Sequence, residues 1–80
     1  VSWALMPQSD PLESAKRAYL EGRFEDSVDE ITPLLETLKD SASLRDANFF
    51  LGLNNRALGR ETDAGKHFRA AVRQDPAFLP

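Results

Sequence analysis

The single histidine of the chain is the first residue whose side chain suggests chemistry. Nucleophilic catalysis requires a Ser, Thr or Cys activated by a positioned base, and His67 is the one imidazole available for that role. The chain has no Cys, which excludes disulfides, cysteine nucleophiles and thiolate zinc sites, and one histidine does not make a multi-histidine metal site. We therefore interpret His67 as an ordinary helix residue and expect neither a metal nor a cofactor.

A cluster of four carboxylates is the second feature with catalytic potential. It consists of Glu25, Asp26, Asp29 and Glu30, from which a general acid and a general base could be drawn. Their spacing instead predicts the solvated face of a helix, with no apolar pocket around them. The four glycines are too widely spaced to form a phosphate-binding loop. We expect a non-catalytic protein, and an enzyme built on these acids is the more remote alternative.

The composition describes one small folded domain. The chain has 80 residues, of which 41% are hydrophobic and 29% charged, as in soluble globular proteins. Residues 1–40 hold four basic and nine acidic residues, giving −5, whereas residues 41–80 hold six and four, giving +2. These scattered basic residues do not form the stripe that nucleic-acid binding requires, so we expect no nucleic-acid partner. No apolar run is long enough to span a membrane.

The first half of the chain predicts two amphipathic helices. Asp10 followed by Pro11 predicts a helix start, with Glu13 completing a capping box and Gly22 ending the helix. A second helix begins after this turn, and Pro33 should kink it without stopping it, because the apolar stripe continues beyond the proline. That stripe comprises Phe24, Val28, Ile31, Leu34, Leu35 and Leu38.

The second half predicts another pair of helices. Ser41 or Ser43 is the expected N-cap of the third helix, which Gly59 closes. The fourth helix carries an apolar stripe and ends at residues 75–76, an Asp-Pro pair. No segment alternates with period two, so the predicted fold class is all-α. The third helix places Ala47, Phe50, Leu51, Asn54 and Leu58 on one stripe, and the fourth Ala64, Phe68, Ala71 and Val72.

The two halves repeat one pattern at an offset of 37 residues. Gly22 and Gly59 each separate two amphipathic helices, which makes the chain a duplicated helical hairpin. Small residues within the pattern should allow close helix approach, while larger ones fill the space between helices. The matching pairs are Ala15 with Gly52, Ser27 with Ala64, Ile31 with Phe68, and Leu35 with Val72.

The second half resembles a tetratricopeptide repeat (TPR). The motif consists of Leu51-Gly52, Gly59, Ala64, Phe68, Ala71 and Asp75-Pro76. It departs from the family at Asn48 and Asn55, where Trp and Tyr are usual, which should weaken helix packing, and the first half matches more loosely. The resemblance implies two tandem hairpins stacked as a right-handed α-solenoid. We expect an N-terminal extension at 1–9 and a TPR-like domain at 10–80, with repeats at about 10–40 and 43–78.

The resemblance also implies a binding function. Hairpins of this family present their first helices on a concave surface that receives a partner's peptide or helix. Lys16 and Arg56 could offer a reduced form of the carboxylate clamp found in some members, although solvent-exposed charges are the preferred interpretation of both. The expected partner-binding residues are Lys16, Tyr19, Phe49, Leu53 and Arg56, and the wider inner face adds Leu12, Glu13, Asp46 and Phe50.

The ends of the array raise an alternative. A repeat array needs polar caps, and the four residues 77–80 provide no further helix to cover the fourth one. Residues Trp3, Leu5 and Met6 could fold over an exposed face, two chains could associate, or the chain could be part of a longer repeat protein, which is the interpretation we favour. The alternative function is self-association into a homo-oligomer. The similarity to modules of bacterial proteins is compatible with the cytoplasm or the periplasm.

Overall fold

The computed structural model describes residues 10–78, and for Phe78 the backbone only. The N-terminal residues that could fold over an exposed face, Trp3, Leu5 and Met6, lie outside this described part. Every regular element within residues 10–78 is helical, which confirms the all-α prediction. The elements are α1 (Glu13–Leu20), α2 (Phe24–Ile31), the 3₁₀ helix η2 (Thr32–Glu36), α3 (Ser41–Ala57), α4 (Glu61–Gln74) and the 3₁₀ helix η3 (Pro76–Phe78).

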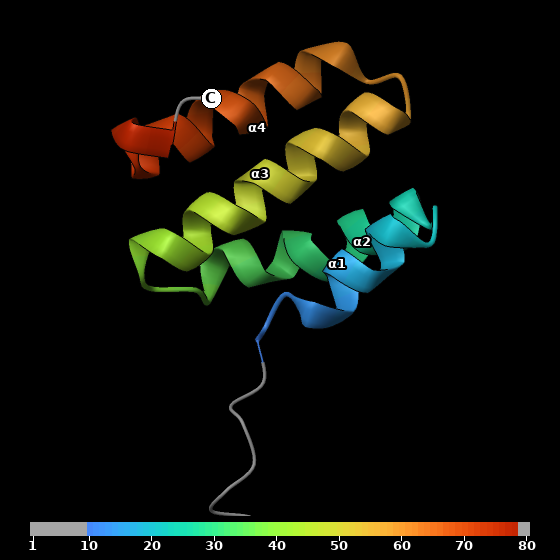
Figure 1. Cartoon of the computed structure of the whole chain (residues 1–80), viewed down its shortest axis with the longest axis horizontal. Coiled ribbons are helices and arrows are strands. Elements are labelled where there is room, and N and C mark those ends of the chain that lie inside the picture. The colour runs from blue at the N-terminus through green and yellow to red at the C-terminus, as the bar shows by residue number, and fades with distance from the viewer. Residues whose placement is uncertain (1–9, 79–80) are drawn as a thin grey trace, which may run out of the picture.

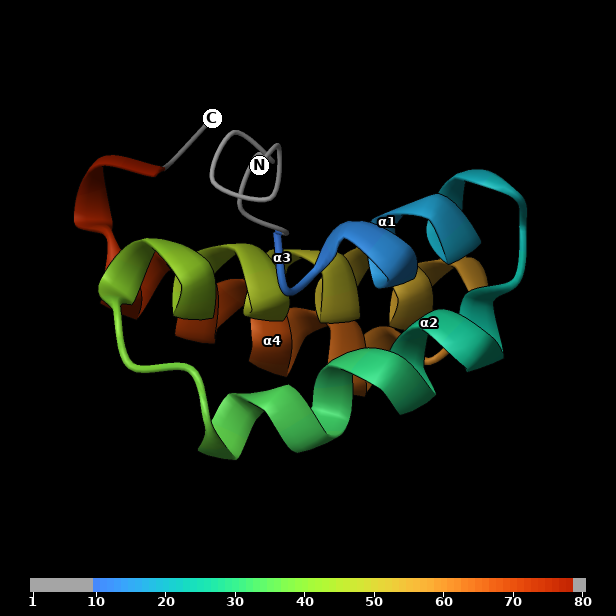
Figure 2. The same ribbon diagram turned by 90° about the horizontal axis from the view of Figure 1, so that it is seen from below.

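The helices form two consecutive hairpins that share α3 as their central element. α3 lies between α4 and the hairpin of α1 and α2 (Figure 1). The view at right angles shows α1 and α3 toward one side of the molecule, with α2 and η2 at the opposite side (Figure 2). α1 and α3 are the first helices of their hairpins. The residues predicted to bind a partner are expected on the outward sides of these two helices.

The turn of each hairpin has the same backbone geometry. Gly22 and Gly59 adopt φ values of 79° and 80°, which L-residues with a side chain rarely adopt. Gly22 donates its N–H to the carbonyl of Tyr19 (3.0 Å), and the next residue donates to the carbonyl five positions back (2.8 Å). The same two bonds recur at Gly59, at 3.1 and 2.8 Å. Both turns are Schellman motifs, which satisfy the last carbonyls of the preceding helix.

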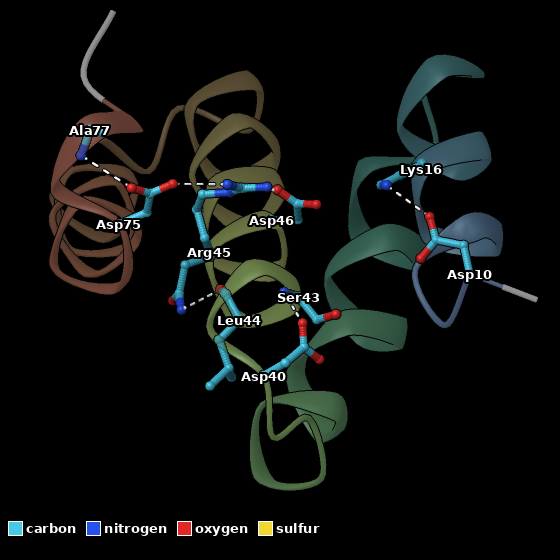
Figure 3. Close-up of polar contacts among 10 residues, drawn as sticks. Asp10, Lys16, Asp40, Ser43, Leu44, Arg45, Asp46, Asp75 and Ala77 are labelled. Atoms are coloured by element: carbon cyan, nitrogen blue, oxygen red, sulfur yellow. Dashed lines mark hydrogen bonds and ion pairs between the residues drawn. The ribbon is translucent and has the colours of Figure 1, made fainter.

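The helix starts differ in detail from the predictions. The Asp10 carboxylate accepts the N–H of Leu12 (2.9 Å), but α1 begins only at Glu13, whose carboxylate pairs with Arg17 (3.4 Å). The predicted capping box is therefore wrong: Leu12 is the N-cap of α1 and makes no side-chain cap bond, and the N–H of Glu13 bonds the backbone carbonyl of Asp10 instead of its carboxylate. The prediction of a serine cap for α3 is wrong, because Asp40 is the N-cap and accepts the N–H of Ser43 at 2.9 Å (Figure 3). This backbone hydrogen bond lowers the pKa of the Asp40 carboxyl.

Pro33 changes the type of helix. The α-helical segment ends at Ile31, and the chain continues as the 3₁₀ helix η2 with Pro33 in its first turn. Proline lacks the N–H that an α-helix would use at that position, and its ring crowds the preceding turn. Leu34 and Leu35 nevertheless still pack against the core. The predicted kink is thus a transition to 3₁₀ geometry that keeps the apolar stripe facing inward.

The core joins the first hairpin to α3. Its buried cluster consists of residues that are at most 2% exposed, and larger half-buried side chains surround it. Between α3 and α4 the contact is made by small residues, since Ala64 and Ala71 are buried and Gly52 lies directly under the ring of Phe68. This agrees with the expected role of small residues in close helix packing. The cluster comprises Leu12, Ala15, Ile31, Ala47 and Leu51, bordered by Val28, Leu34, Leu35, Leu38 and Phe50.

A buried chain of hydrogen bonds links three helices. Asn54 of α3 donates through Nδ2 to Ser27 Oγ of α2 (2.8 Å) and to the carbonyl of Phe50 (2.9 Å). Ser27 Oγ in turn donates to the carbonyl of Ala15 in α1 (2.8 Å). Ser27 and Asn54 are both 0% exposed. We refer to Asn54, Ser27 and the Ala15 carbonyl as the polar relay.

Ser27→Ala should destabilise the fold by about 1 to 3 kcal/mol. It leaves one N–H of Asn54 buried without a partner and removes the second hydrogen bond of the Ala15 carbonyl, and a buried donor without a partner loses its hydration without compensation. Urea denaturation would measure the change in the free energy of unfolding. The matched control is Thr32→Ala, which removes an exposed hydroxyl that bonds the Val28 carbonyl at 2.8 Å and should cost less than about 0.5 kcal/mol. Equal costs in the two variants would contradict a special role for the relay.

Gly52→Ala and Gly65→Ala should shift stability in opposite directions. A Cβ at position 52 would lie 2.5 Å from two ring carbons of Phe68, whereas one at position 65 would meet only the mobile end of Arg69, at 3.2 Å. Alanine gains about 1 kcal/mol over glycine in a helix, but overpacking costs about 1 to 3 kcal/mol. We expect a lower melting temperature for the first variant and an unchanged or higher one for the second. A stabilised Gly52→Ala would contradict the close approach of α3 and α4.

Candidate functional site

The five residues predicted to bind a partner come from the first helix of each hairpin. Lys16 and Tyr19 lie on α1, and Phe49, Leu53 and Arg56 lie on α3; we call them the α1–α3 surface. Four of these side chains are half-buried, and Arg56 is exposed. A half-buried side chain is held in place by its neighbours yet still offers area to a ligand, which is a property of binding surfaces.

Aromatic rings connect this surface to all four α-helices. Tyr19 lies 5.7 Å from Phe24 and 5.7 Å from Phe50, measured between ring centroids. Phe50 lies 5.8 Å from Phe49, which lies 6.0 Å from Phe68. The interplanar angles range from 52° to 82°, the tilted and edge-to-face arrangements that aromatic pairs favour. These five half-buried rings, the aromatic row, run from α2 through α1 and α3 to α4.

Lys16 is held by two contacts. Its ammonium forms an ion pair with Asp10 (2.8 Å) and lies 5.6 Å from the centroid of the Phe50 ring, a cation–π arrangement. The hydrogen bond from Lys16, followed by that from the Leu12 N–H, lowers the pKa of the Asp10 carboxyl. Figure 3 shows the Lys16 side chain directed toward Asp10. Lys16 is therefore an oriented charge at the edge of the aromatic row.

Arg56 behaves differently from Lys16. It lies in the last turn of α3, is exposed, and has no carboxylate partner within residues 10–78. No interaction of the described part joins Arg56 to Lys16, so the two charges predicted as a reduced clamp are not linked to each other.

The structure places several residues of the wider inner face elsewhere. Leu12 is only 2% exposed and belongs to the core, so its assignment to a binding face was wrong. The reason is that α3 packs across the first hairpin and covers it. Asp46 pairs with Arg45 at 2.9 Å, and Arg45 also reaches Asp75 at 2.9 Å, which ties α3 to the end of α4 (Figure 3). Sequence reasoning missed this bridge, because a separation of 30 positions between Arg45 and Asp75 leaves no local signal.

His67 takes part in the contact between α3 and α4. Its Nδ1 lies 3.0 Å from Oδ1 of Asn48, while Nδ2 of Asn48 donates to the carbonyl of Leu44 (3.0 Å). Since Oδ1 can only accept, Nδ1 carries the proton in this arrangement. No hydrogen bond within residues 10–78 joins His67 to a serine or threonine. Partial burial, together with the nearby Lys66, lowers the pKa of His67, while Asp63 opposes the shift.

Three of the four carboxylates of α2 are exposed, and Glu30 is half-buried. Glu25 accepts a hydrogen bond from Arg60 at 2.6 Å, which joins the start of α2 to the start of α4, and Asp26 pairs with Arg23 at 3.3 Å. Within the described residues, no group of three or more His, Cys, Asp or Glu side chains could hold a metal ion. None of the described helices is both long and apolar enough to span a bilayer.

Three comparisons with known proteins found no relative of this chain. Models of protein families, curated proteins and solved structures were compared with the chain, and none matched. The functional interpretation therefore rests on the residues of the chain and on their arrangement.

Acidification from about pH 7.5 to 5.5 should destabilise the chain through His67. The folded state lowers its pKa below the unfolded value of about 6.5, so the unfolded chain binds the proton more readily as the pH falls through this range. Denaturant midpoints at several pH values would measure the effect, and His67→Gln should remove it. Asp10 and Asp40 have lowered pKa values and contribute only at more acidic pH. A wild-type midpoint that stays constant over the range would contradict this assignment.

Proposed function

We propose that the chain is a non-catalytic protein-interaction or scaffold module of the TPR type, and that it binds a peptide or helix of a protein partner on the α1–α3 surface. The aromatic row is the observation that carries the proposal. It brings half-buried rings of both hairpins together, so that a ligand crossing α1 and α3 would contact rings whose positions are already fixed. Ligand binding would then cost little additional side-chain entropy.

The charges beside the aromatic row suggest which ligands fit. The oriented ammonium of Lys16 and the exposed guanidinium of Arg56 lie on the same pair of helices as the rings. A peptide that combines apolar side chains with a carboxylate, either acidic or C-terminal, would complement both features. Aromatic and arginine side chains are also the residue types that most often dominate binding energies at protein interfaces.

The repeated hairpin geometry supports the TPR assignment. Two Schellman turns 37 residues apart and the close approach of Gly52 to Phe68 are what the family pattern implies at these positions. At the two positions where the chain departs from the family pattern, Asn48 contacts His67 and Asn55 donates to the carbonyl of Leu51 at 2.8 Å. Polar contacts thus take the place of the aromatic packing that the family uses, and the hairpin still forms.

Peptides selected from a random phage-displayed library against the whole chain would test the proposal. Tyr19→Ala and Arg56→Ala should each weaken binding of the selected peptides by about tenfold, because they remove a central ring and the exposed charge. Fluorescence anisotropy would measure the affinities, and circular dichroism would verify folding. Lys39→Ala, in the connector between η2 and α3, is the control and should leave affinity unchanged. Unaltered binding by both test variants would refute the α1–α3 surface as the binding site.

A further inference from the structure

Leu20, the last residue of α1, is the one large hydrophobic residue that lies exposed in the described part of the chain. It is 80% exposed, whereas its neighbour Ala18 is buried and Tyr19 is half-buried. A leucine exposed to this extent forgoes most of the free energy that its burial would contribute to folding. The side chain therefore offers apolar area that the fold itself does not use.

The fold does not require a leucine at this position. Leu20 is absent from the core cluster and from the residues that border it. In a Schellman turn, the accompanying apolar contact joins the residue after the glycine to the helix residue five positions before it, here Arg23 and Ala18, and leaves Leu20 out. The equivalent residue of the second hairpin is Ala57, which is also exposed. The same turn thus forms with an alanine in that place.

The position of Leu20 continues the α1–α3 surface, although the sequence-based prediction of that surface did not include it. Leu20 follows Lys16 by four residues and lies on the same face of α1, and the Lys16 ammonium lies 5.6 Å from the ring centroid of Phe50 in α3. α1 and α3 run in the same direction (Figures 1 and 2). One and two turns beyond Phe50, α3 carries the half-buried Leu53 and the exposed Ala57. We call Leu20, Leu53 and Ala57 the aliphatic end of the surface.

The charges beside the aliphatic end indicate which ligand group would accompany an apolar side chain. Arg56 lies three residues after Leu53, in the last turn of α3, and no ion pair within residues 10–78 joins it to a carboxylate. Glu21 follows Leu20 directly, but it pairs with Arg23 at 2.8 Å. A carboxylate on the ligand would complement Arg56, because opposite charges at an interface favour association.

We propose that Leu20 anchors a subsite for an aliphatic side chain of the partner peptide, the size of leucine, isoleucine or methionine, with a carboxylate of the same peptide directed at Arg56. This inference rests on the proposed function and deepens it. It gives the α1–α3 surface a direction, with aromatic contacts in the middle and the aliphatic contact at the end near the hairpin turns. A stable dimer buries about 800 Å² per partner, more than two leucines and an alanine offer, whereas one peptide side chain fits between them.

Two variants of nearly equal shape give a sharp test with peptides selected from the phage-displayed library. Leu20→Gln should weaken binding by about tenfold, whereas Leu20→Met should stay within about threefold of the wild type, because glutamine and methionine differ in polarity but little in length or helix propensity. Urea midpoints should be unchanged in both, since the side chain is exposed.

Changes in the peptide test the two contacts separately. The selected peptides should share an aliphatic residue, and replacing it by alanine should cost affinity in the wild type and much less in Leu20→Gln. Converting the peptide carboxylate to an amide should weaken binding to the wild type and leave binding to Arg56→Gln nearly unchanged.

The outcomes separate this inference from the proposed function. Binding that Tyr19→Ala weakens and Leu20→Gln leaves intact would refute the anchor while the α1–α3 surface stands. Binding that neither variant alters, or a library that yields no peptide, would contradict both. A wild-type chain that is dimeric by light scattering and monomeric in Leu20→Gln would assign Leu20 to a contact between copies. Weaker binding in Tyr19→Ala and Leu20→Gln, with affinity retained in Leu20→Met, would support the anchor.

Discussion

The polar relay is the constraint on which the arrangement of the first three helices depends. Asn54 reaches Ser27, and Ser27 reaches the Ala15 carbonyl, all in a region without solvent exposure. A buried polar group that loses its partner costs free energy, so the bonds form only when α1, α2 and α3 adopt one relative register. The relay also leaves Oδ1 of Asn54 without a partner within the described residues. Its contribution is therefore better understood as selecting one packing than as adding net stability.

The two hairpins use the same backbone and different contacts. Both turns are closed by glycine in the left-handed region, and both hairpins rely on small residues where helices approach. The first hairpin packs against α3 through leucine and isoleucine side chains and the polar relay. Within the second hairpin, α4 packs against α3 through the contact of Gly52 with Phe68, the pair of His67 with Asn48, and the bridge from Arg45 to Asp75.

The proposed binding properties follow from where α3 lies. Because α3 covers the first hairpin, Leu12 is withdrawn into the core and Phe50 becomes a bridge between Tyr19 and Phe49. The other side of α3, with Phe49 and Arg56, borders the α1–α3 surface. One helix thus serves as a core element, as the centre of the aromatic row and as part of the candidate docking surface.

The sequence by itself determined the helices, the two glycine turns and the 37-residue repeat. These features depend on local rules, namely apolar periodicity, proline and the φ preference of glycine, which act over a few residues. The tertiary structure decided that Leu12 is buried and that Arg45 reaches Asp75, whereas the Asp40 cap of α3 and the 3₁₀ helix that follows Ile31 are local features that the residue pattern left open. It also decided which candidate residues meet: Tyr19, Phe50 and Phe49 make ring contacts, whereas Lys16 and Arg56 are not joined. Such outcomes depend on the angle and register between packed helices, which long-range burial and hydrogen bonding select and which residue spacing alone does not encode.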